Sequence, residues 1–448
     1  MLLFAAPGGC GSSPPPGTQA DLATDSPDMA VSSRSYTSTK IPACGQAGFQ
    51  SQLAVSADGK TVGVVSIANT TMKGTCTLQG RPPMDVPAYD LCFAESSGGG
   101  AFATSKVSSE RYLSLNGVGL AYSSTGDANV AFTGNGAGVP EAQFRCGASN
   151  LILRTGKGGT WAAARTIATG SQSGGLVPDQ MANCIQDVCN SGDATGYWPA
   201  IAIAPSGLLG LAWRDIHFGR DTDDNSSSDV EYAAGPGFGS LTVDVVRGGG
   251  QFTRLAYTAA NRPAIVHYNG DRKDATGIWI DWDSGSGWKS ARISKARAGE
   301  MLGFAIGPGD LFALAYYDQD GARLVYLESS GGTTWSDPVD VDTDGVTGMY
   351  PSLTFDPGGQ PAIAYYRCRD YDPVNRGCDR ERDGLMLARR SGGRWNVESV
   401  TARSGFYDGL YPSLGFAEGG KAVIAYQSRA FDPGSNVTTF ELDVARED

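Results

Sequence analysis

The stretch YPSLTFDPGGQPAIAYY (Tyr350–Tyr366) decides the fold, because it has the pattern of a β-hairpin and recurs along the chain. Its first arm carries apolar residues, a turn of Asp, Pro and Gly follows, and an arm of β-branched and aromatic residues returns. The clearest copy is YPSLGFAEGGKAVIAYQ (Tyr411–Gln427), and weaker ones are WPAIAIAPSGLLGLAWR and MLGFAIGPGDLFALAYY. A hairpin repeated in this way indicates a repeat architecture.

Seven copies of the hairpin can be aligned on an anchor residue in the first arm that has its counterpart twelve positions later in the second arm. The pairs are Leu53/Val65, Leu120/Phe132, Ile201/Trp213, Leu255/His267, Phe304/Tyr316, Leu353/Tyr365 and Leu414/Tyr426. The spacing between anchors suits one structural unit per copy, so the sequence predicts seven units.

Two further strand-like runs follow each hairpin. The third run ends in a Gly-rich turn closed by an aromatic residue, as in GLMLARRSGGRW (Gly384–Trp395), and a short fourth run such as NVESVT (Asn396–Thr401) follows. Four-stranded units repeated radially are the blades of a propeller. We therefore predict an all-β chain that forms a seven-bladed β-propeller of four-stranded antiparallel blades, with two stacked sandwiches as the alternative.

The last unit ends at its third strand, near Phe440–Ala445, so its fourth strand has to come from elsewhere in the chain. The segment SYTSTKI (Ser35–Ile41) has β-branched residues and no other partner before the first repeat. We expect this segment to close the ring, which leaves only short, protected edges. The propeller would then span 35–448.

The N-terminal residues MLLFAAPGGC (Met1–Cys10) resemble the end of a bacterial lipoprotein signal peptide, because an apolar stretch and small residues precede a cysteine. We expect lipidation of Cys10 and an unstructured tether over 11–34, which is polar and rich in Pro and Ser. The protein would be anchored at the outer membrane or cell surface, with the periplasm and the medium as alternatives.

Eight of the nine cysteines remain once Cys10 is set aside, an even number that suits disulfides in an oxidising compartment. Reduced cysteines in the cytosol are the alternative. Two expected bridges close short loops: Cys184–Cys189 and Cys368–Cys378. The other four cysteines, Cys44, Cys76, Cys92 and Cys146, can pair in three ways, of which we favour the one that contains Cys76–Cys92.

The formal net charge of −12 argues against nucleic acid and against an anionic membrane face as partners, because phosphate binding needs a basic surface. We expect a monomer that meets a membrane only through its lipid anchor. The loop RDTDDNSSSDVE offers the several oxygen ligands that Ca²⁺ prefers, and a solvated acidic loop is the alternative. We favour the solvated loop and expect no cofactor; if Ca²⁺ does bind, its candidate ligands are Asp221, Asp223, Asp224 and Asp229.

Insertions between the repeats indicate where a binding site is expected. The turn between first and second strands is short in every unit, whereas long segments follow the second strand or join two units; these are Ser66–Tyr89, Thr133–Ser149, Arg214–Ser228, Arg367–Asp383 and Ile167–Tyr197. In a propeller both loop classes emerge on one face, and variable loops on a rigid scaffold carry binding sites. We place the functional site on that face, at the mouth of the central channel.

Residues at the strand ends on that face are the candidate ligand-binding residues. Aromatic residues open inner strands, and Arg or Asp residues leave second strands, a combination that suits sugars, acidic ones included. The candidates are Tyr197, Trp198, Arg214, Asp215, Arg254, His267, Asp318, Tyr350, Arg367, Arg369, Tyr411 and Arg429. The alternative is that Tyr-Pro at a strand start serves packing and that the charged residues are solvated.

The repeat G-x-YPSL-x-x-D-x-x-G-x-P-x-IAYYD, followed by L-x-YA and GG-x-W, resembles a propeller repeat of secreted bacterial proteins, including lipoproteins of myxobacteria, and is distantly similar to sialidase-type (BNR) propellers. This resemblance covers about 49–448 and implies a fold more than a function. The segment DWDSGSGW approaches the sialidase Asp-box S-x-D-x-G-x-x-W, with Asp281 in place of the Ser. Lys40 stands where sialidases carry an arginine of the triad that binds the substrate carboxylate, which argues against sialidase activity.

Two function classes follow. In the first, the propeller binds a glycan or an extracellular protein and performs no chemistry. In the second it is a glycoside hydrolase or polysaccharide lyase, for which the candidate groups are His267, Tyr350, Asp215, Asp318 and Glu300. We favour binding; two carboxyl groups about 5–10 Å apart beside the Tyr/Arg cluster would favour hydrolysis.

Overall fold

The computed structural model describes residues 34–42, 46–76, 84–110, 117–134, 149–169, 194–216, 228–235, 242–270, 276–368, 371–372, 377–378, 383–432, 434–435 and 437–448. Most of these residues lie in β-strands, which form seven sheets with four main antiparallel strands each and one small two-stranded sheet. The predicted all-β, seven-bladed propeller is thereby confirmed.

The first three blades follow one another in the sequence, and each runs from an inner to an outer strand. They are blade 1 with β2 (Gln46–Val55), β3 (Thr61–Cys76), β4 (Met84–Ser97) and β5 (Ala103–Glu110); blade 2 with β6 (Val118–Tyr122), β7 (Ala128–Gly134), β8 (Asn150–Lys157) and β10 (Arg165–Thr169), with β9 (Thr160–Trp161) beside β8; and blade 3 with β11 (Ala194–Ile203), β12 (Leu209–Ile216), β13 (Asp229–Gly235) and β14 (Thr242–Gly248).

The remaining blades continue the same order. They are blade 4 with β15 (Gln251–Tyr257), β16 (Pro263–Asn269), β17 (Gly277–Asp283) and β18 (Trp288–Ser294); blade 5 with β19 (Ala298–Gly307), β20 (Leu311–Asp318), β21 (Arg323–Ser330) and β22 (Val339–Asp342); blade 6 with β23 (Val346–Phe355), β24 (Pro361–Cys368), β27 (Gly384–Ser391) and β28 (Arg394–Thr401); and blade 7 with β29 (Phe406–Phe416), β30 (Ala422–Asp432) and β31 (Val437–Glu447).

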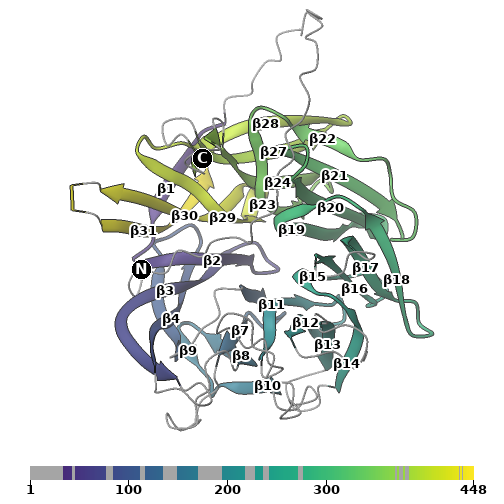
Figure 1. Ribbon diagram of the computed structural model, residues 1–448, viewed down its shortest axis with the longest axis horizontal. Coiled ribbons are helices and arrows are strands. Elements are labelled where there is room, and N and C mark those ends of the chain that lie inside the picture. Colours follow the sequence, from purple (N-terminus) through teal and green to yellow (C-terminus); the bar gives the residue numbers. More distant parts are fainter. Residues whose placement is uncertain are drawn as a thin grey trace, which may run out of the picture. The chain divides into compact units, whose positions relative to one another are not determined.

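The inner strands surround a central channel. Each inner strand contacts the inner strand of the next blade, and β29 of blade 7 contacts β2 of blade 1, so the ring is closed. The colours of Figure 1 run around this ring in sequence order.

The fourth strand of blade 7 is β1 (Tyr36–Lys40), which pairs antiparallel with β31. Tyr36 lies opposite Glu447 and Lys40 lies opposite Asp443. In Figure 1 this purple strand lies among the yellow strands of the last blade. The predicted closure of the ring by Ser35–Ile41 is confirmed.

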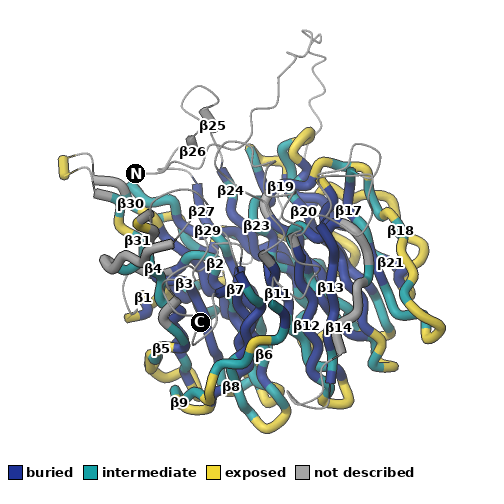
Figure 2. The backbone as a smooth tube through the Cα atoms, turned by 60° about the horizontal axis from the view of Figure 1, so that its bottom comes forward, coloured by how far each residue is buried: buried dark blue, intermediate teal, exposed yellow. Residues whose placement is uncertain are grey.

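The hydrophobic core consists of seven clusters, one at each interface between neighbouring blades. The Trp that closes a third-to-fourth turn packs on an aromatic ring of the preceding blade, with Trp161 on Phe93, Trp288 on Tyr232 and Trp395 on Tyr326, at centroid distances of 5.0–5.2 Å. Figure 2 shows buried residues along the strands and exposed residues at the turns. Each blade is therefore stabilised mainly by its two neighbours.

The disulfide predictions have three different outcomes. Cys368 and Cys378 are bonded, with their Cα atoms 5.3 Å apart, and the bond joins β24 to the small strand β26 (Gly377–Cys378). Cys92 is also disulfide-bonded, but it lies opposite Ser66 on β3, whereas Cys76 lies opposite Met84. Because ten residues of strand separate those positions, the favoured Cys76–Cys92 pairing is wrong. Cys184 and Cys189 lie outside the described residues.

Within the described ranges, no helix has the length and apolar character needed to cross a membrane. Cys10 and the rest of 1–33 lie outside these ranges, so lipidation and the tether stay predictions.

Candidate functional site

An unusual backbone conformation occurs at one equivalent position in all seven inner strands. The third residue before each anchor has a positive φ, and in six blades the register with the second strand shifts beside it. These seven residues, which we call the collar, are Gln50, Gly117, Trp198, Phe252, Met301, Tyr350 and Tyr411. Left-handed backbone costs a non-glycine residue about 1 kcal/mol or more, so six blades hold a strained residue at the same place.

The bulge next to the collar presses against the preceding blade. Gly348 and Gly409 each precede a collar tyrosine by two residues and have φ values of 94° and 106°. A Cβ on Gly348 would lie 2.7 Å from the Cα of Leu324, and one on Gly409 would lie 2.6 Å from the Cβ of Leu385. Only glycine fits at these two positions, and the neighbouring blade therefore holds the bulge in place.

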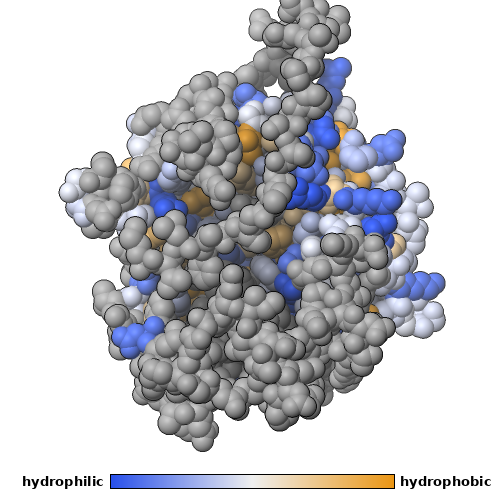
Figure 3. All heavy atoms as spheres, viewed as in Figure 1, coloured by the Kyte–Doolittle hydropathy of each residue, from blue (hydrophilic) through white to orange (hydrophobic). Residues whose placement is uncertain are grey.

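The collar side chains form aromatic groups. The rings of Tyr350 and Tyr411 are 4.3 Å apart, and those of Trp198 and Phe252 are 5.3 Å apart and edge-on. These four side chains are half-buried. Where side chains are visible between the grey segments in Figure 3, apolar ones lie beside hydrophilic ones. The arrangement offers partly exposed aromatic faces beside the channel.

Two of the predicted site residues support the Trp198 side of the collar. The guanidinium of Arg214 lies 5.4 Å from the ring centroid of Trp198, within cation–π range. The ring of Tyr197 lies 6.2 Å from that of Trp198 and is 9% exposed. Both residues sit at the end of β11 or β12 that flanks the loop after the second strand, the end at which we predicted the site.

The central channel contains a cavity of about 490 Å³. Its wall is built from six inner strands and includes the collar residues Met301 and Tyr350. Arg254 follows the collar residue Phe252 by two positions and is the charged residue among the described residues of this wall. It therefore lies further along β15, deeper in the channel than the collar.

Arg254 has no acidic partner among the described residues. Its Nη1 donates a hydrogen bond to the Thr253 carbonyl oxygen at 3.0 Å, which is a neutral acceptor. Burial lowers the pKa of Arg254 to about 10. The guanidinium therefore stays protonated at neutral pH, and no described side chain compensates its charge.

The position of Arg254 has another use in blades 6 and 7. Ser352 and Ser413 occupy the equivalent place in their inner strands, and their hydroxyls accept hydrogen bonds from the Leu414 and Leu53 N–H groups of the next blade, at 2.9 and 2.8 Å. The serine of the YPSL repeat is thus an interblade contact. Blade 4 carries a cation there instead.

Two of the predicted site residues are wrong because they are buried inside their blades. Asp215 and His267 are both 0% exposed. The Gly250 N–H donates to His267 Nδ1 at 3.1 Å, and His267 Nε2 lies 3.0 Å from Asp281 Oδ2. His267 belongs to a buried His–Asp pair within blade 4 and cannot meet a ligand at the channel mouth.

Other predicted charges are already engaged. Asp318 accepts the Asp320 N–H at 3.2 Å and lies 3.3 Å from Arg323 Nε, so it stabilises the turn after β20. Arg367 lies 3.2 Å from Asp344. These contacts argue against Arg367 as a free anion-binding group.

The remaining candidates lie away from the channel wall or cannot be placed. Arg429 is exposed and lies over Tyr407 and Phe440, at 5.9 and 5.8 Å from the ring centroids. Arg369 lies outside the described residues, as does the side chain of Glu300.

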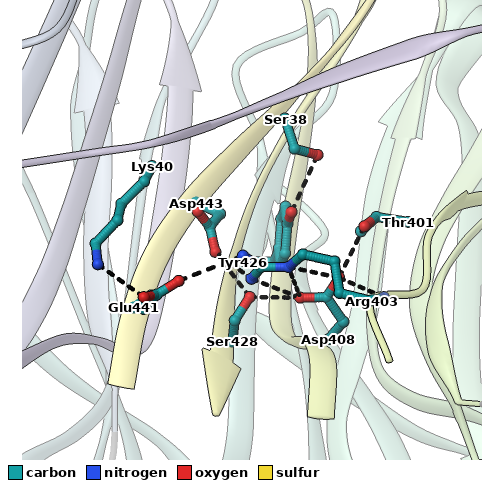
Figure 4. Close-up of polar contacts among 9 residues, drawn as sticks. All are labelled: Ser38, Lys40, Thr401, Arg403, Asp408, Tyr426, Ser428, Glu441 and Asp443. Atoms are coloured by element: carbon teal, nitrogen blue, oxygen red, sulfur yellow. Dashed lines mark hydrogen bonds and ion pairs between the residues drawn. The ribbon is translucent and has the colours of Figure 1, made fainter. Parts of the chain in front are cut away.

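Nine polar residues of blade 7 and of the segment that leads into it from β28 form what we call the closure cluster (Figure 4): Ser38, Lys40, Thr401, Arg403, Asp408, Tyr426, Ser428, Glu441 and Asp443. Arg403 lies 2.9 Å from Asp408, 2.9 Å from Asp443 and 3.3 Å from Glu441. The cluster also holds β1, because Lys40 lies 2.7 Å from Glu441 and Tyr426 donates to Ser38 at 3.1 Å.

The carboxyl groups of Asp408 and Asp443 are both within hydrogen-bond distance of the Ser428 hydroxyl, at 2.6 and 2.7 Å. A hydroxyl has one proton, so it can donate to only one of them, and the other bond requires a protonated carboxyl. Burial raises the pKa of Asp443, which favours the proton there. Both carboxyls are buried and bonded to Arg403, an arrangement that suits ring closure better than attack on a substrate.

In the part of the chain that the structure describes, no group of three or more His, Cys, Asp or Glu residues is arranged to hold a metal ion. Of the four predicted calcium ligands only Asp229 is described, in β13 and 9% exposed. Calcium binding by the loop stays a prediction.

Several solved structures resemble this chain. A protein of unknown function from Dyadobacter fermentans is 11% identical and matches 92% of this chain and 98% of its own, with a TM-score of 0.47. An α-L-arabinofuranosidase of Fusarium graminearum is 11% identical over 91% of this chain and 96% of its own, with a TM-score of 0.46. The Aleuria aurantia lectin, solved with α-methyl-L-fucoside, is 12% identical over 80% and 96%, with a TM-score of 0.44. No protein-family model and no curated protein matches the chain, and these likenesses carry no argument about what it binds.

Proposed function

We propose that this protein binds a saccharide at the channel mouth, with the collar aromatics as the platform for the sugar ring. The main evidence for this proposal is the collar, because six blades keep a strained non-glycine residue at the same position. Backbone strain of this kind is retained at sites that hold a ligand. Half-buried Trp198, Phe252, Tyr350 and Tyr411 supply apolar faces of the kind on which sugar rings pack.

Binding without chemistry fits the channel better than hydrolysis. The described residues of its wall include hydroxyls, an amide and one arginine but no carboxyl group. The two carboxyl groups that do lie close together, those of Asp408 and Asp443, are bonded to Arg403 and to the same hydroxyl. A glycoside hydrolase or polysaccharide lyase remains the second candidate, and the same experiment checks it.

We further propose that the propeller acts outside the cytoplasm, attached to the outer membrane or cell surface through a lipid on Cys10. The bond between Cys368 and Cys378 supports an oxidising compartment. Metabolic labelling with a radioactive fatty acid tests the anchor, since labelling that persists in a Cys10→Ser variant would contradict it.

The test of saccharide binding uses Tyr350→Gly and Tyr411→Gly on a glycan array. Glycine already occupies the collar position of blade 2 at Gly117, with a φ of 113°, so these variants remove a ring without straining the backbone. We expect selective binding by the unchanged protein and at least about a ten-fold loss in each variant, because an aromatic platform contributes on the order of 1–2 kcal/mol.

Ala322→Gly is the matched control. Ala322 also has a positive φ, of 52°, but lies in the turn after β20 and carries no ring. Its binding should equal that of the unchanged protein. An array without any bound glycan, or equal binding by the collar variants, would contradict the proposal, and the release of reducing sugar from a bound glycan would move the function to hydrolysis.

A further inference from the structure

The central channel holds a cation that no side chain of the described protein neutralises. Arg254 faces the cavity, bonds only to the neutral Thr253 carbonyl, and is absent from every ion pair among the described residues. A half-buried charge without a partner is unfavourable for folding, so such a group persists where a counter-ion comes from outside. Arg403 in blade 7 shows the contrast, since three carboxyl groups surround it.

The slot that Arg254 occupies normally takes a small side chain. In the seven inner strands the residue before the anchor is Gln52, Gly119, Ala200, Arg254, Gly303, Ser352 or Ser413. The small residues fit because this position faces the next inner strand: a Cβ on Gly303 would lie 3.1 Å from the Leu353 backbone nitrogen. Only blades 1 and 4 carry long polar side chains in the slot, and both of these residues line the cavity.

The chemistry of the slot selects one kind of anion. A planar guanidinium forms two parallel hydrogen bonds to a carboxylate, and a single positive charge matches a monoanion better than a doubly charged phosphate. Gln52 adds a carboxamide that can donate a further hydrogen bond to the anion or to a neighbouring hydroxyl. Tyr350 of the collar and Arg254 line the same cavity of about 490 Å³, so one sugar can contact both the aromatic platform and the guanidinium.

We infer that the channel accepts the carboxylate of a sugar acid of the uronate class, with Arg254 as the anion-binding residue and the sugar ring against the collar. The inference rests on the proposed saccharide binding and names the ligand class. The ligand would enter with its carboxylate first and neutralise the only charge on the described channel wall. Arg254 suits this role better than Arg367, a candidate ligand-binding residue that already pairs with Asp344.

The experiment compares D-glucuronate with D-glucose, which differ only in having a carboxylate or a hydroxymethyl group at C6. The thermal midpoint of the full chain is measured against increasing concentrations of each sugar. We expect glucuronate to raise the midpoint and glucose to raise it much less, with affinity for glucuronate about ten-fold higher or more because a charge-assisted pair is made.

Two arginine variants decide whether Arg254 carries the effect. Arg254→Gln should lose the glucuronate shift, whereas Arg262→Gln, which removes an exposed arginine from the same blade at the opposite end of β15 and β16, should keep it. Arg254→Lys keeps the positive charge but lacks the planar guanidinium, and it replaces Arg254→Gln as the test if the glutamine variant does not fold. It should weaken glucuronate binding and leave glucose binding unaffected.

The outcomes separate this inference from the proposed function. Equal shifts for glucose and glucuronate, or an unchanged glucuronate shift in Arg254→Gln, would overturn the uronate assignment while saccharide binding stands if the collar variants reduce the shifts. Equal shifts for acetate and glucuronate would show a site for any small carboxylate and would overturn the assignment to a sugar. The absence of a shift for every probe would overturn both proposals.

Discussion

Arg254 in blade 4 and Arg403 in blade 7 are both partly shielded from water, yet their surroundings are opposite. Arg403 bonds to Asp408 and Asp443 and approaches Glu441, whereas Arg254, among the described residues, bonds only to a backbone carbonyl. A cation whose charge is already balanced stabilises the fold, and a cation whose charge is unbalanced is available to a ligand. The comparison separates the structural arginines of this propeller from the functional one, and the following experiments test that separation.

The largest effect is expected from removing the strand that the closure cluster holds. Deletion of Tyr36–Lys40 takes away the edge partner of β31 and the Tyr36 side chain, which packs on the core between blades 6 and 7. We expect a loss of stability of at least several kcal/mol, or no folded protein, because a blade and its interface core are left incomplete. Thermal unfolding followed by circular dichroism measures it, with a control protein from which only 1–33 are removed; an unaltered midpoint after the strand deletion would refute the closure role.

The next largest effect is expected from Arg403→Met. The change leaves Asp408 and Asp443, both nearly inaccessible to water, without their cation. Breaking a buried pair on one side costs about 3–5 kcal/mol, and we expect about 2–3 kcal/mol here because 38% of the Arg403 side chain is exposed. Urea unfolding measures the change, and Arg429→Met, at an exposed arginine of the same blade, is the control. Equal stability of the two variants would remove the contrast between Arg403 and Arg254.

Asp443→Asn is expected to change the pH dependence of stability. Burial raises the pKa of Asp443 in the folded protein above its usual value of 3.8. At a pH between the usual pKa and the folded-state pKa, the folded state therefore binds more protons than the unfolded state. The contribution of this group to stability is therefore complete at low pH and declines as the pH rises through the folded pKa. Asparagine is neutral at every pH, so the variant should gain stability relative to the unchanged protein as the pH rises.

The groups that face Asp443 decide how this experiment is read. Asp408, Arg403, Ser428 and Glu441 all belong to the cluster, and the pKa of Glu441 is lowered because hydrogen bonding and charge from Lys40 and Arg403 outweigh the opposing effect of burial. Glu441→Gln should therefore lose stability on the alkaline side instead. Urea unfolding from about pH 4 to pH 8 measures both variants. Parallel stability curves for Asp443→Asn and the unchanged protein would place the shared proton elsewhere.

The smallest effect, and the one with the opposite sign, is expected from Arg254→Met. Replacing an uncompensated cation by an apolar side chain of similar length should raise stability by about 1 kcal/mol in the absence of ligand. The same variant should gain nothing from glucuronate. Urea unfolding in a buffer of low anion content measures the first part, and a loss of stability similar to that of Arg403→Met would show that Arg254 is a structural residue.

The sequence predicted the architecture because the same hairpin pattern occurs in all seven blades. A closed ring of blades accounts for three features of the sequence together. These are the YPSL hairpins, the aromatic residues at the third-to-fourth turns and the unpaired segment Ser35–Ile41. Cys368–Cys378 was predictable for the same reason, since its loop is short and local. The Cys76–Cys92 pairing was wrong because it depends on the register of two long strands, which the spacing of two cysteines does not determine.

The candidate site was predicted only in part. Trp198, Tyr350 and Tyr411 were found because they open inner strands, but Phe252 and Met301 occupy the same collar position without the Tyr-Pro or Trp-Pro pattern. The glycine two residues before Phe252, Met301 and the collar tyrosines is the signal that could have found them. His267 and Asp215 were misplaced because a strand end does not reveal whether a side chain points to the loops or between the sheets.

The pairing of β1 with β31 has a consequence for how the molecule is made. Tyr36 is among the first residues of the propeller to leave the ribosome and its partner Glu447 is among the last. Blade 7 therefore cannot be completed during synthesis. The apolar surfaces at which blades 1 and 7 meet remain exposed to solvent until all seven repeats have left the ribosome. Maturation of such a chain should be limited by the meeting of its two ends, and an assisting factor that shields the first blade would speed it.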